Sequence, residues 1–239
     1  QGFNCLMDTL FKPFSTSSYL EEIKLIQPQG PYFLAGHSFG GFVAFEIAQQ
    51  LSRQGETVAV LALFDCFGPN GCDKSTFPQR LSIHLNNLSE LSFREKLAYF
   101  TDRFEYILQS KIPWSWQQNY LKLINLISSP EQKLIWQIQN INFQANQRYT
   151  PTVYEGKLTL FRARVRQAYG YFDPYGGWQG MALGGIDGDE VPGSHTSLLL
   201  KPENSQILAE KLKPILANFT DQPQLDESAK MTQIKLRQN

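Results

Sequence analysis

One short segment combines glycines and a serine in a pattern typical of nucleophilic catalysis. The segment is Gly36-His37-Ser38-Phe39-Gly40-Gly41, and it contains the pattern G-x-S-x-G. Glycines permit the tight, strained turn that projects the Ser38 hydroxyl, and we expect side chains at positions 36 or 40 to obstruct that turn. A helix that starts here would offer unpaired N–H groups to a developing oxyanion, with the Phe39 N–H as the first donor. Ser38 is therefore the candidate nucleophile.

A serine hydroxyl needs a general base, and the sequence contains three histidines. His37 lies inside the turn, where we expect it to pack beside Ser38. His84 lies in a region of helical periodicity and is interpreted as a solvated residue or part of a lid. His195 stands in the segment Val-Pro-Gly-Ser-His, after the last predicted strand and before the C-terminal helix. This position makes His195 the candidate base.

The base in turn needs an acid that orients it, and two aspartates compete for this role. Asp65 ends an apolar strand, where a carboxylate without a polar partner would be costly. Asp173 follows a later strand but lies in a glycine-rich stretch beside a proline, which is also typical of a turn residue. We favour Asp65. Asp187 and Asp189 are interpreted as turn residues.

The elements around these residues alternate between strand and helix. The segment 31–65 reads as strand, helix and strand, which together form a βαβ unit with the serine turn between the first strand and the helix. Helical periodicity dominates residues 79–150, and strand patterns return later. The predicted strands are 2–7, 31–35, 57–65, 157–165 and one within 183–191, and the predicted flanking helices are 17–27, 41–55 and 202–219. The fold class is α/β, and the motif order predicts an α/β-hydrolase fold with a mostly parallel sheet.

The length and composition are typical of one ordinary globular domain. The chain has 239 residues, with 22 basic and 22 acidic side chains, 42% hydrophobic and 18% charged residues. The zero net charge and the absence of a lysine and arginine run argue against nucleic-acid binding. No apolar stretch reaches membrane-spanning length and the start of the sequence has no secretory pattern, so we expect no membrane partner and a cytoplasmic location.

The domain is predicted over 1–220, with a helical lid inserted at about 66–150 and a polar C-terminal tail over 221–239. The cysteines do not indicate a disulfide framework or a metal site. They are odd in number and have no CxxC spacing, and we interpret them as buried or incidental thiols: Cys5, Cys66 and Cys72.

Taken together, these segments resemble the thioesterase domains of nonribosomal peptide synthetases and related polyketide synthases. The resemblance is carried by IQPQGPYFLAGHSFGGFVAFEIAQQLSRQGETVAVLALFD over 26–65, and by the later segments GKLTLFRA, DPYGGW and EVPGSH in the same order. Ser38, Asp65 and His195 occupy the three triad positions of that family. Ser194 stands where the family usually has an aspartate before the catalytic histidine.

The resemblance implies release of an acyl or peptidyl chain from a carrier protein through an acyl-serine intermediate, by hydrolysis or cyclisation. The phosphopantetheine arm would belong to the carrier, so the chain itself is expected to need no cofactor and no metal. The insertion would correspond to a lid, and its aromatic residues either line an acyl channel or, as we favour for most of them, form the lid's own core: Phe100, Phe104, Tyr106, Trp114, Trp116 and Trp136. Two alternatives remain open, a catalytically weak module that binds carrier proteins and a serine carboxylesterase.

One part of the expected fold has little room in the sequence. Only 37 residues precede Ser38, which is short for the early strands of a complete α/β-hydrolase sheet. We therefore expect the N-terminal strands to be missing or reduced in a shortened thioesterase domain. The loop that supplies the second oxyanion N–H in this family falls in that part, so the second donor stays unassigned.

Overall fold

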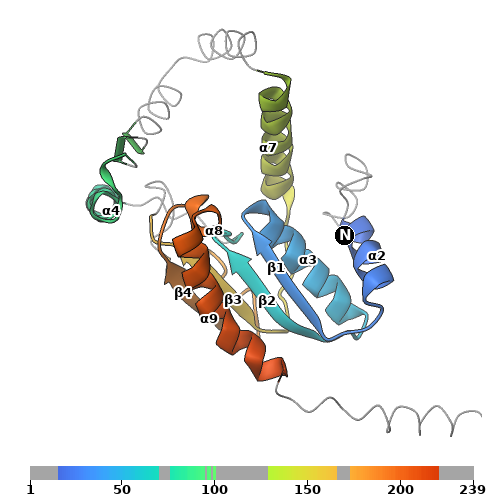
Figure 1. Cartoon of the computed structure of the whole chain (residues 1–239). Coiled ribbons are helices and arrows are strands. Elements are labelled where there is room, and N and C mark those ends of the chain that lie inside the picture. Colours follow the sequence, from blue (N-terminus) through green and yellow to red (C-terminus); the bar gives the residue numbers. More distant parts are fainter. Residues whose placement is uncertain are drawn as a thin grey trace, which may run out of the picture.

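A central parallel sheet with helices on both faces forms the framework of the protein (Figure 1). The computed structural model describes residues 16–69, 76–94, 96–97, 99–100, 129–165 and 173–220. The described strands follow one another in the order β1-β2-β3-β4, and each pairs in parallel with its neighbour. They are β1 (Tyr32–His37), β2 (Val58–Phe64), β3 (Leu158–Ala163) and β4 (Ile186–Val191). The predicted α/β class and parallel sheet are confirmed.

Three helices flank the βαβ unit and the end of the domain at the predicted places, and two further helices belong to the insertion (Figure 1). A short helix, α8, follows the loop that carries His195. The bounds are α2 (Thr16–Ile26), α3 (Phe39–Arg53), α4 (Phe77–Glu90), α7 (Pro130–Arg148), α8 (Ser197–Leu200) and α9 (Pro202–Thr220). The strand predicted over 2–7, the tail over 221–239, and Cys5 and Cys72 lie outside the described residues.

Alternate side chains of the buried strands face opposite helices, as the two-residue repeat of a strand requires. On β2 and β3, Leu63 and Leu160 pack with Phe45 of α3 and with the fully buried Trp178. Their neighbours in sequence, Phe64 and Phe161, face the other side, where Val191, Leu198 and Leu208 complete a second cluster with α8 and α9. The sheet is thus the middle of three layers, and its apolar strands have no polar alternation because both faces are covered.

The prediction that Asp187 and Asp189 are turn residues was wrong. Both lie within the edge strand β4 and not in a turn. Their exposed side chains form ion pairs with Lys157, at 2.6 Å, and with Lys211. A strand at a sheet edge tolerates such charges because its outer side chains stay in water, and the charges oppose pairing with another chain.

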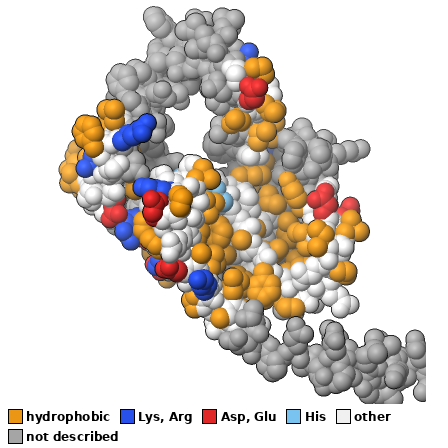
Figure 2. All heavy atoms as spheres, viewed as in Figure 1, with side chains coloured by type: hydrophobic (Ala, Val, Ile, Leu, Met, Phe, Trp, Pro, Cys, Tyr) orange, Lys and Arg blue, Asp and Glu red, His pale blue; other side chains and the backbone are white. Residues whose placement is uncertain are grey.

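The insertion exposes many apolar side chains in the part that the structure describes (Figure 2). On α4 the exposed residues recur every four positions, so they lie on one face of that helix. They are Phe77, Leu81 and Leu85, and on α7 they are Leu134, Ile135 and Ile138. Of the aromatic residues considered for the lid, Phe100 is 55% exposed, and Phe104, Tyr106, Trp114 and Trp116, with the side chain of Trp136, lie outside the described part. Among the described helices, none is both long enough and apolar enough to cross a bilayer.

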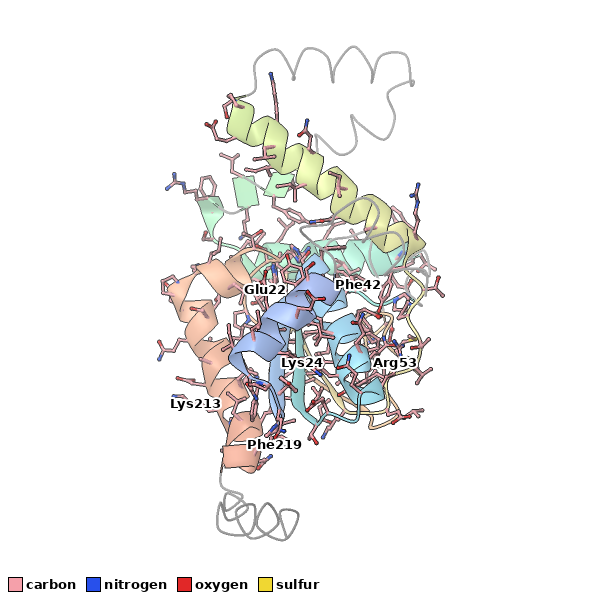
Figure 3. All side chains as sticks on the ribbon, turned by 90° about the vertical axis from the view of Figure 1, so that its right-hand side faces the viewer. Glu22, Lys24, Phe42, Arg53, Lys213 and Phe219 are labelled. Atoms are coloured by element: carbon pink, nitrogen blue, oxygen red, sulfur yellow. The ribbon has the colours of Figure 1, made fainter. Side chains whose placement is uncertain are left out.

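A buried polar contact joins the helix after the serine turn to the end of the insertion. Tyr149, which directly follows α7, donates its hydroxyl to Glu46 Oε2 at 2.8 Å. The same carboxylate accepts a hydrogen bond from Gln50 and lies 3.8 Å from the Arg53 guanidinium, near the end of α3 opposite to Phe42 (Figure 3). Burial and, after it, the Glu46 charge raise the pKa of Tyr149 above its ordinary value. The contact thus fixes the C-terminal end of α7 to α3.

Replacing Tyr149 with phenylalanine is expected to lower the free energy of unfolding by about 1–2 kcal/mol at pH 7, because a buried carboxylate oxygen loses its donor. The difference should shrink above pH ~10, where unfolded Tyr149 ionises and the folded residue does not, so that the wild type loses the stability linked to its raised pKa. Urea unfolding at both pH values measures this. Tyr175→Phe, at an exposed tyrosine, is the control, and equal stability of Tyr149→Phe and the wild type at pH 7 would contradict the prediction.

Candidate active site

The serine turn has the strained backbone that its sequence predicts. Ser38 directly follows β1 and directly precedes α3, with φ 54° and ψ −124°. Few side-chain-bearing residues adopt positive φ, so such a backbone persists only where the surroundings hold it. Here the Ser38 N–H donates to the Phe64 carbonyl of β2 at 3.0 Å, and the Gly41 N–H donates to the Ser38 carbonyl at 3.0 Å. These bonds place Ser38 at the carboxyl ends of the parallel strands.

Gly36 is the position at which the turn requires a missing side chain. A Cβ built on Gly36 would lie 2.2 Å from the Gly40 carbonyl oxygen, which is backbone and has little freedom to move. The expectation for position 40 was wrong for the described surroundings, because a Cβ on Gly40 meets no described atom within 4 Å. The reason is geometric: the backbone of Gly40 passes over Gly36, while the Cα–H bond that a Gly40 side chain would replace points away. Gly41 also needs its hydrogen, since a Cβ there would lie 2.6 Å from Cys66 Sγ.

Alanine at Gly36 and alanine at Gly40 should therefore have different effects on the free energy of unfolding. Gly36→Ala is expected to lower the free energy of unfolding by about 3 kcal/mol, the upper range for forced overpacking. Gly40→Ala should leave stability unchanged or raise it by up to about 1 kcal/mol, since alanine is the better helix former. Thermal unfolding of both variants compares them directly, and a Gly36→Ala variant as stable as Gly40→Ala would refute the close approach in the turn.

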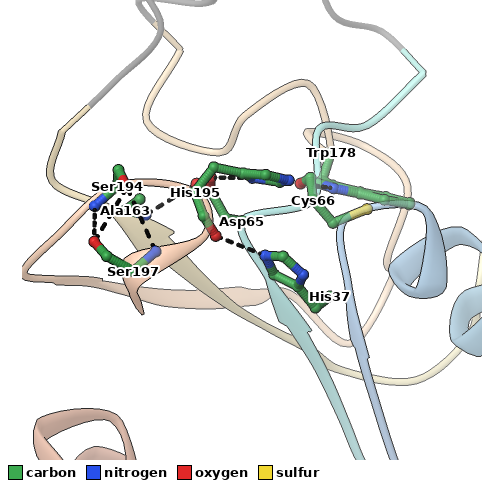
Figure 4. A network of polar contacts seen from close by, with 8 residues as sticks. All are labelled: His37, Asp65, Cys66, Ala163, Trp178, Ser194, His195 and Ser197. Carbon is green, nitrogen blue, oxygen red and sulfur yellow. Dashed lines mark hydrogen bonds and ion pairs between the residues drawn. The ribbon is translucent and has the colours of Figure 1, made fainter. Parts of the chain in front are cut away.

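The candidate base and the favoured acid lie in direct contact. The ring N–H at Nδ1 of His195 donates to Asp65 Oδ2 at 2.6 Å (Figure 4). The other carboxylate oxygen, Oδ1, accepts the Ala163 N–H at 2.9 Å, and the Asp65 N–H donates to the Phe161 carbonyl at 2.7 Å. The Asp65 side chain is 8% exposed and that of His195 is 32% exposed. The carboxylate is therefore held by the end of β3, and it fixes one edge of the imidazole ring.

The three residues from distant parts of the sequence meet at one edge of the sheet. Ser38 is bonded through its backbone to Phe64, the residue before Asp65, and Asp65 binds His195. His195 stands on the loop between β4 and α8, in a turn closed by bonds between Ser194 and Ser197. Ser38 Oγ and His195 Nε2 are not hydrogen-bonded to each other in this structure.

The competing aspartate has a different set of partners. Asp173 Oδ1 accepts the Tyr175 N–H at 2.9 Å, and Oδ2 accepts the Gly177 N–H at 2.6 Å. Its backbone carbonyl accepts a hydrogen bond from Arg162 at 3.0 Å. The carboxylate thus closes its own turn, and this turn presents Trp178, whose indole N–H donates to the Cys66 carbonyl at 2.8 Å. Aspartate side chains in turns commonly accept hydrogen bonds from backbone N–H groups a few residues later, and Asp173 does this here.

The remaining histidines and the described cysteine fill separate positions. His84 lies on α4 with Nδ1 2.6 Å from the Tyr99 hydroxyl. Cys66 is a buried free thiol, and burial raises its pKa, so it stays protonated. His37 points toward His195 and has a contact that sequence reasoning missed, because no local pattern reports a partner 158 positions away. No cluster of three or more potential metal ligands occurs among the described residues.

Comparison with known families agrees with this geometry. The family model described as "Thioesterase domain" matches residues 16–216. The chain belongs to the thioesterase domain family. A bikaverin polyketide synthase of Gibberella fujikuroi is 39% identical over 114 residues, 48% of this chain and 5% of that protein. Malpibaldin synthetase of Mortierella alpina is 29% identical over 196 residues, 81% of this chain and 3% of that protein. This thioesterase-family chain thus spans a few per cent of the length of these relatives.

Solved structures share the thioesterase fold. The thioesterase domain of NocB, solved as a covalent complex with a fluorophosphonate nocardicin G analogue, superposes with a TM-score of 0.55 at 24% identity, over 84% of this chain and 73% of that one. Human thioesterase 2 superposes with a TM-score of 0.52 at 17% identity, over 88% of this chain and 83% of that one. The predicted likeness to thioesterase domains of peptide and polyketide synthases and the α/β-hydrolase type of fold are confirmed.

Proposed function

We propose that this thioesterase domain releases an acyl or peptidyl chain from the phosphopantetheine arm of a carrier protein through an acyl-Ser38 intermediate. The observation that carries the proposal is the 2.6 Å contact between His195 Nδ1 and Asp65 Oδ2 at the sheet edge where Ser38 lies on its strained turn. A serine beside a histidine that an acid orients is the arrangement required for acyl transfer.

The acylation step follows from the positions of these groups. Asp65 occupies Nδ1 of His195, so the other ring nitrogen, Nε2, is the one available to take the Ser38 proton. Ser38 Oγ then attacks the thioester carbonyl, and the Asp65 carboxylate stabilises the imidazolium that forms. Collapse of the tetrahedral intermediate breaks the C–S bond, and His195 returns the proton to the departing pantetheine sulfur. The product is an acyl-serine and a free thiol.

The developing oxyanion needs donors near the serine turn. No described residue accepts a hydrogen bond from the Phe39 N–H, which begins α3 and lies at the positive end of the helix dipole. We assign this N–H as one oxyanion donor, and the second donor remains unassigned. Each such donor contributes roughly 10²–10³-fold to the rate.

The second step removes the acyl group from Ser38. His195 accepts a proton from water, or from a hydroxyl or amine of the bound acyl or peptidyl chain, while the oxygen or nitrogen attacks the acyl-serine carbonyl. The ester bond to Ser38 then breaks, and His195 returns the proton to Ser38 Oγ, which yields a free acid or a cyclised product respectively. Atoms and protons balance in both steps with the three side chains alone, so we propose that the chain needs no cofactor of its own. The names of the synthase and synthetase relatives support a carrier protein as the partner that presents the substrate.

Covalent labelling and substrate choice test the proposal together. A fluorophosphonate should add one adduct per chain, and peptide mass spectrometry should place it on Ser38. An acyl-pantetheine thioester should be turned over faster than the matched oxygen ester. A folded protein that forms no adduct would support the carrier-binding module and overturn the enzyme, and a clear preference for the oxygen ester would favour a carboxylesterase.

A further inference from the structure

A second histidine contacts the candidate base, both at its backbone carbonyl and at its ring. His37, the last residue of β1, donates its ring N–H at Nε2 to the backbone carbonyl of His195 at 2.8 Å (Figure 4). A carbonyl oxygen only accepts hydrogen bonds, so Nε2 of His37 must carry a proton. The two imidazole rings also contact each other in a tilted arrangement, with centroids 4.5 Å apart and planes inclined by 33°.

The surroundings of His37 favour its neutral form. Burial is the main cause that lowers the pKa of His37, and a positive charge on His195 lowers it further, while the carbonyl contact and the Asp65 charge act in the opposite direction. The titratable groups that face His37 are His195 on its loop and Asp65 at the end of β2, with the Cys66 thiol beyond Asp65. At neutral pH the ring is therefore a neutral imidazole with its proton on Nε2.

We propose that His37 is a positioning residue for His195, which it holds by the hydrogen bond to the backbone carbonyl and by the ring contact, and that only one of the two rings carries a positive charge at a time. The consequence for catalysis rests on the proposed function. Asp65 fixes Nδ1 of the His195 ring and His37 fixes the backbone of the same residue. The loop that carries His195 is thereby tied to β1, the strand that Ser38 directly follows.

The neutral state of His37 matters when His195 takes the Ser38 proton. Two imidazolium rings at a separation of 4.5 Å would repel each other, whereas a neutral ring can remain stacked on the new positive charge. The ring at the position before Ser38 thus supplies His195 with a hydrogen-bond donor and a flat, uncharged surface.

Two substitutions of His37 test its hydrogen bond to the His195 carbonyl and its ring contact separately. His37→Gln keeps an N–H donor that can reach the His195 carbonyl, and His37→Phe keeps the ring contact but leaves that carbonyl without its partner. Because the part-buried carbonyl loses its donor and the backbone of His195 is no longer held, we expect His37→Phe to lower kcat for the thioester about tenfold or more, with KM changed less than about twofold. His37→Gln should stay within about threefold of the wild type. His84→Phe, the same change at the histidine of α4, is the matched control and should leave kcat unchanged.

Nuclear magnetic resonance tests the charge coupling without any turnover, since the chain has only three histidines. Ring nitrogen shifts should identify His37 as the tautomer protonated at Nε2. In His195→Gln, where no positive charge can form at position 195, the titration midpoint of His37 should move to higher pH, while that of His84 stays the same.

The outcomes distinguish the two proposals. If the wild type forms no fluorophosphonate adduct, the proposed function fails, and the titration of His37 still decides the contact between the rings. If His37→Phe turns over the thioester as fast as His37→Gln, the positioning role is refuted. An unchanged His37 midpoint in His195→Gln, or a His37 ring protonated only at Nδ1, overturns the coupling.

Discussion

Ser38→Ala is expected to abolish covalent labelling and to lower thioester turnover by about 10⁴-fold or more. In the proposed mechanism the hydroxyl oxygen is the atom that becomes acylated, and among the serines that the structure describes only Ser38 has a positive φ, 54°, at the start of α3. The hydroxyl does not cap the helix, so its removal costs no hydrogen bond to the backbone of α3. The variant should therefore fold like the wild type. Intact-mass spectrometry after fluorophosphonate treatment and initial rates on an acyl-pantetheine thioester measure the two effects.

The control for this substitution is another serine at the start of a helix. Ser205 Oγ donates to the Pro202 carbonyl in the first turn of α9, at an exposed position. Ser205→Ala loses a hydroxyl of the same kind and should label and turn over like the wild type. Undiminished labelling in Ser38→Ala would show that the probe reacts elsewhere, and it would remove the basis for an acyl-Ser38 intermediate.

Asp65→Asn should lower the acylation rate by about 10⁴-fold, the loss typical of a triad whose histidine is held in the wrong tautomer. The reason lies in the two contacts of the carboxylate. Oδ1 accepts the Ala163 N–H, so the amide oxygen of an asparagine should occupy that place. Its NH₂ group would then face Nδ1 of His195, which must become an acceptor. The ring proton moves to Nε2, and the nitrogen that would take the Ser38 proton can no longer act as a base.

Asp173→Asn is the matched control for Asp65→Asn, because its carboxylate binds two backbone N–H groups of its own turn. An amide can accept only one of these hydrogen bonds, so this variant should lose about 1 kcal/mol of stability and keep its activity within about threefold. Rates of fluorophosphonate labelling, compared with thermal unfolding, separate the two effects. The opposite order of rates would assign the acid to Asp173.

Local patterns in the sequence were sufficient for the elements and for the serine turn. The apolar run of β2, without polar alternation, correctly indicated a strand covered on both faces, because Leu63 and Phe64 face α3 and α9 respectively. The glycine at 36 correctly indicated a close backbone approach. The same kind of reasoning failed at Gly40, because a spacing of glycines does not tell which one faces the crowded side of the turn. It also failed at Asp187 and Asp189, because aspartate is common in turns and is equally well tolerated on a solvent-exposed edge strand.

By itself, the sequence determined the α/β class, the strand-turn-helix setting of Ser38 and the short set of polar residues from which a triad could be drawn. Only the tertiary structure decided which aspartate meets which histidine, because that choice depends on the order of parallel strands. β2 and β3 lie side by side, so the end of β3 supplies the Ala163 N–H that fixes Asp65 toward His195. The contact of His37 with His195 has the same origin: residues 158 positions apart meet because the carboxyl ends of β1 and β4 reach one edge of one sheet.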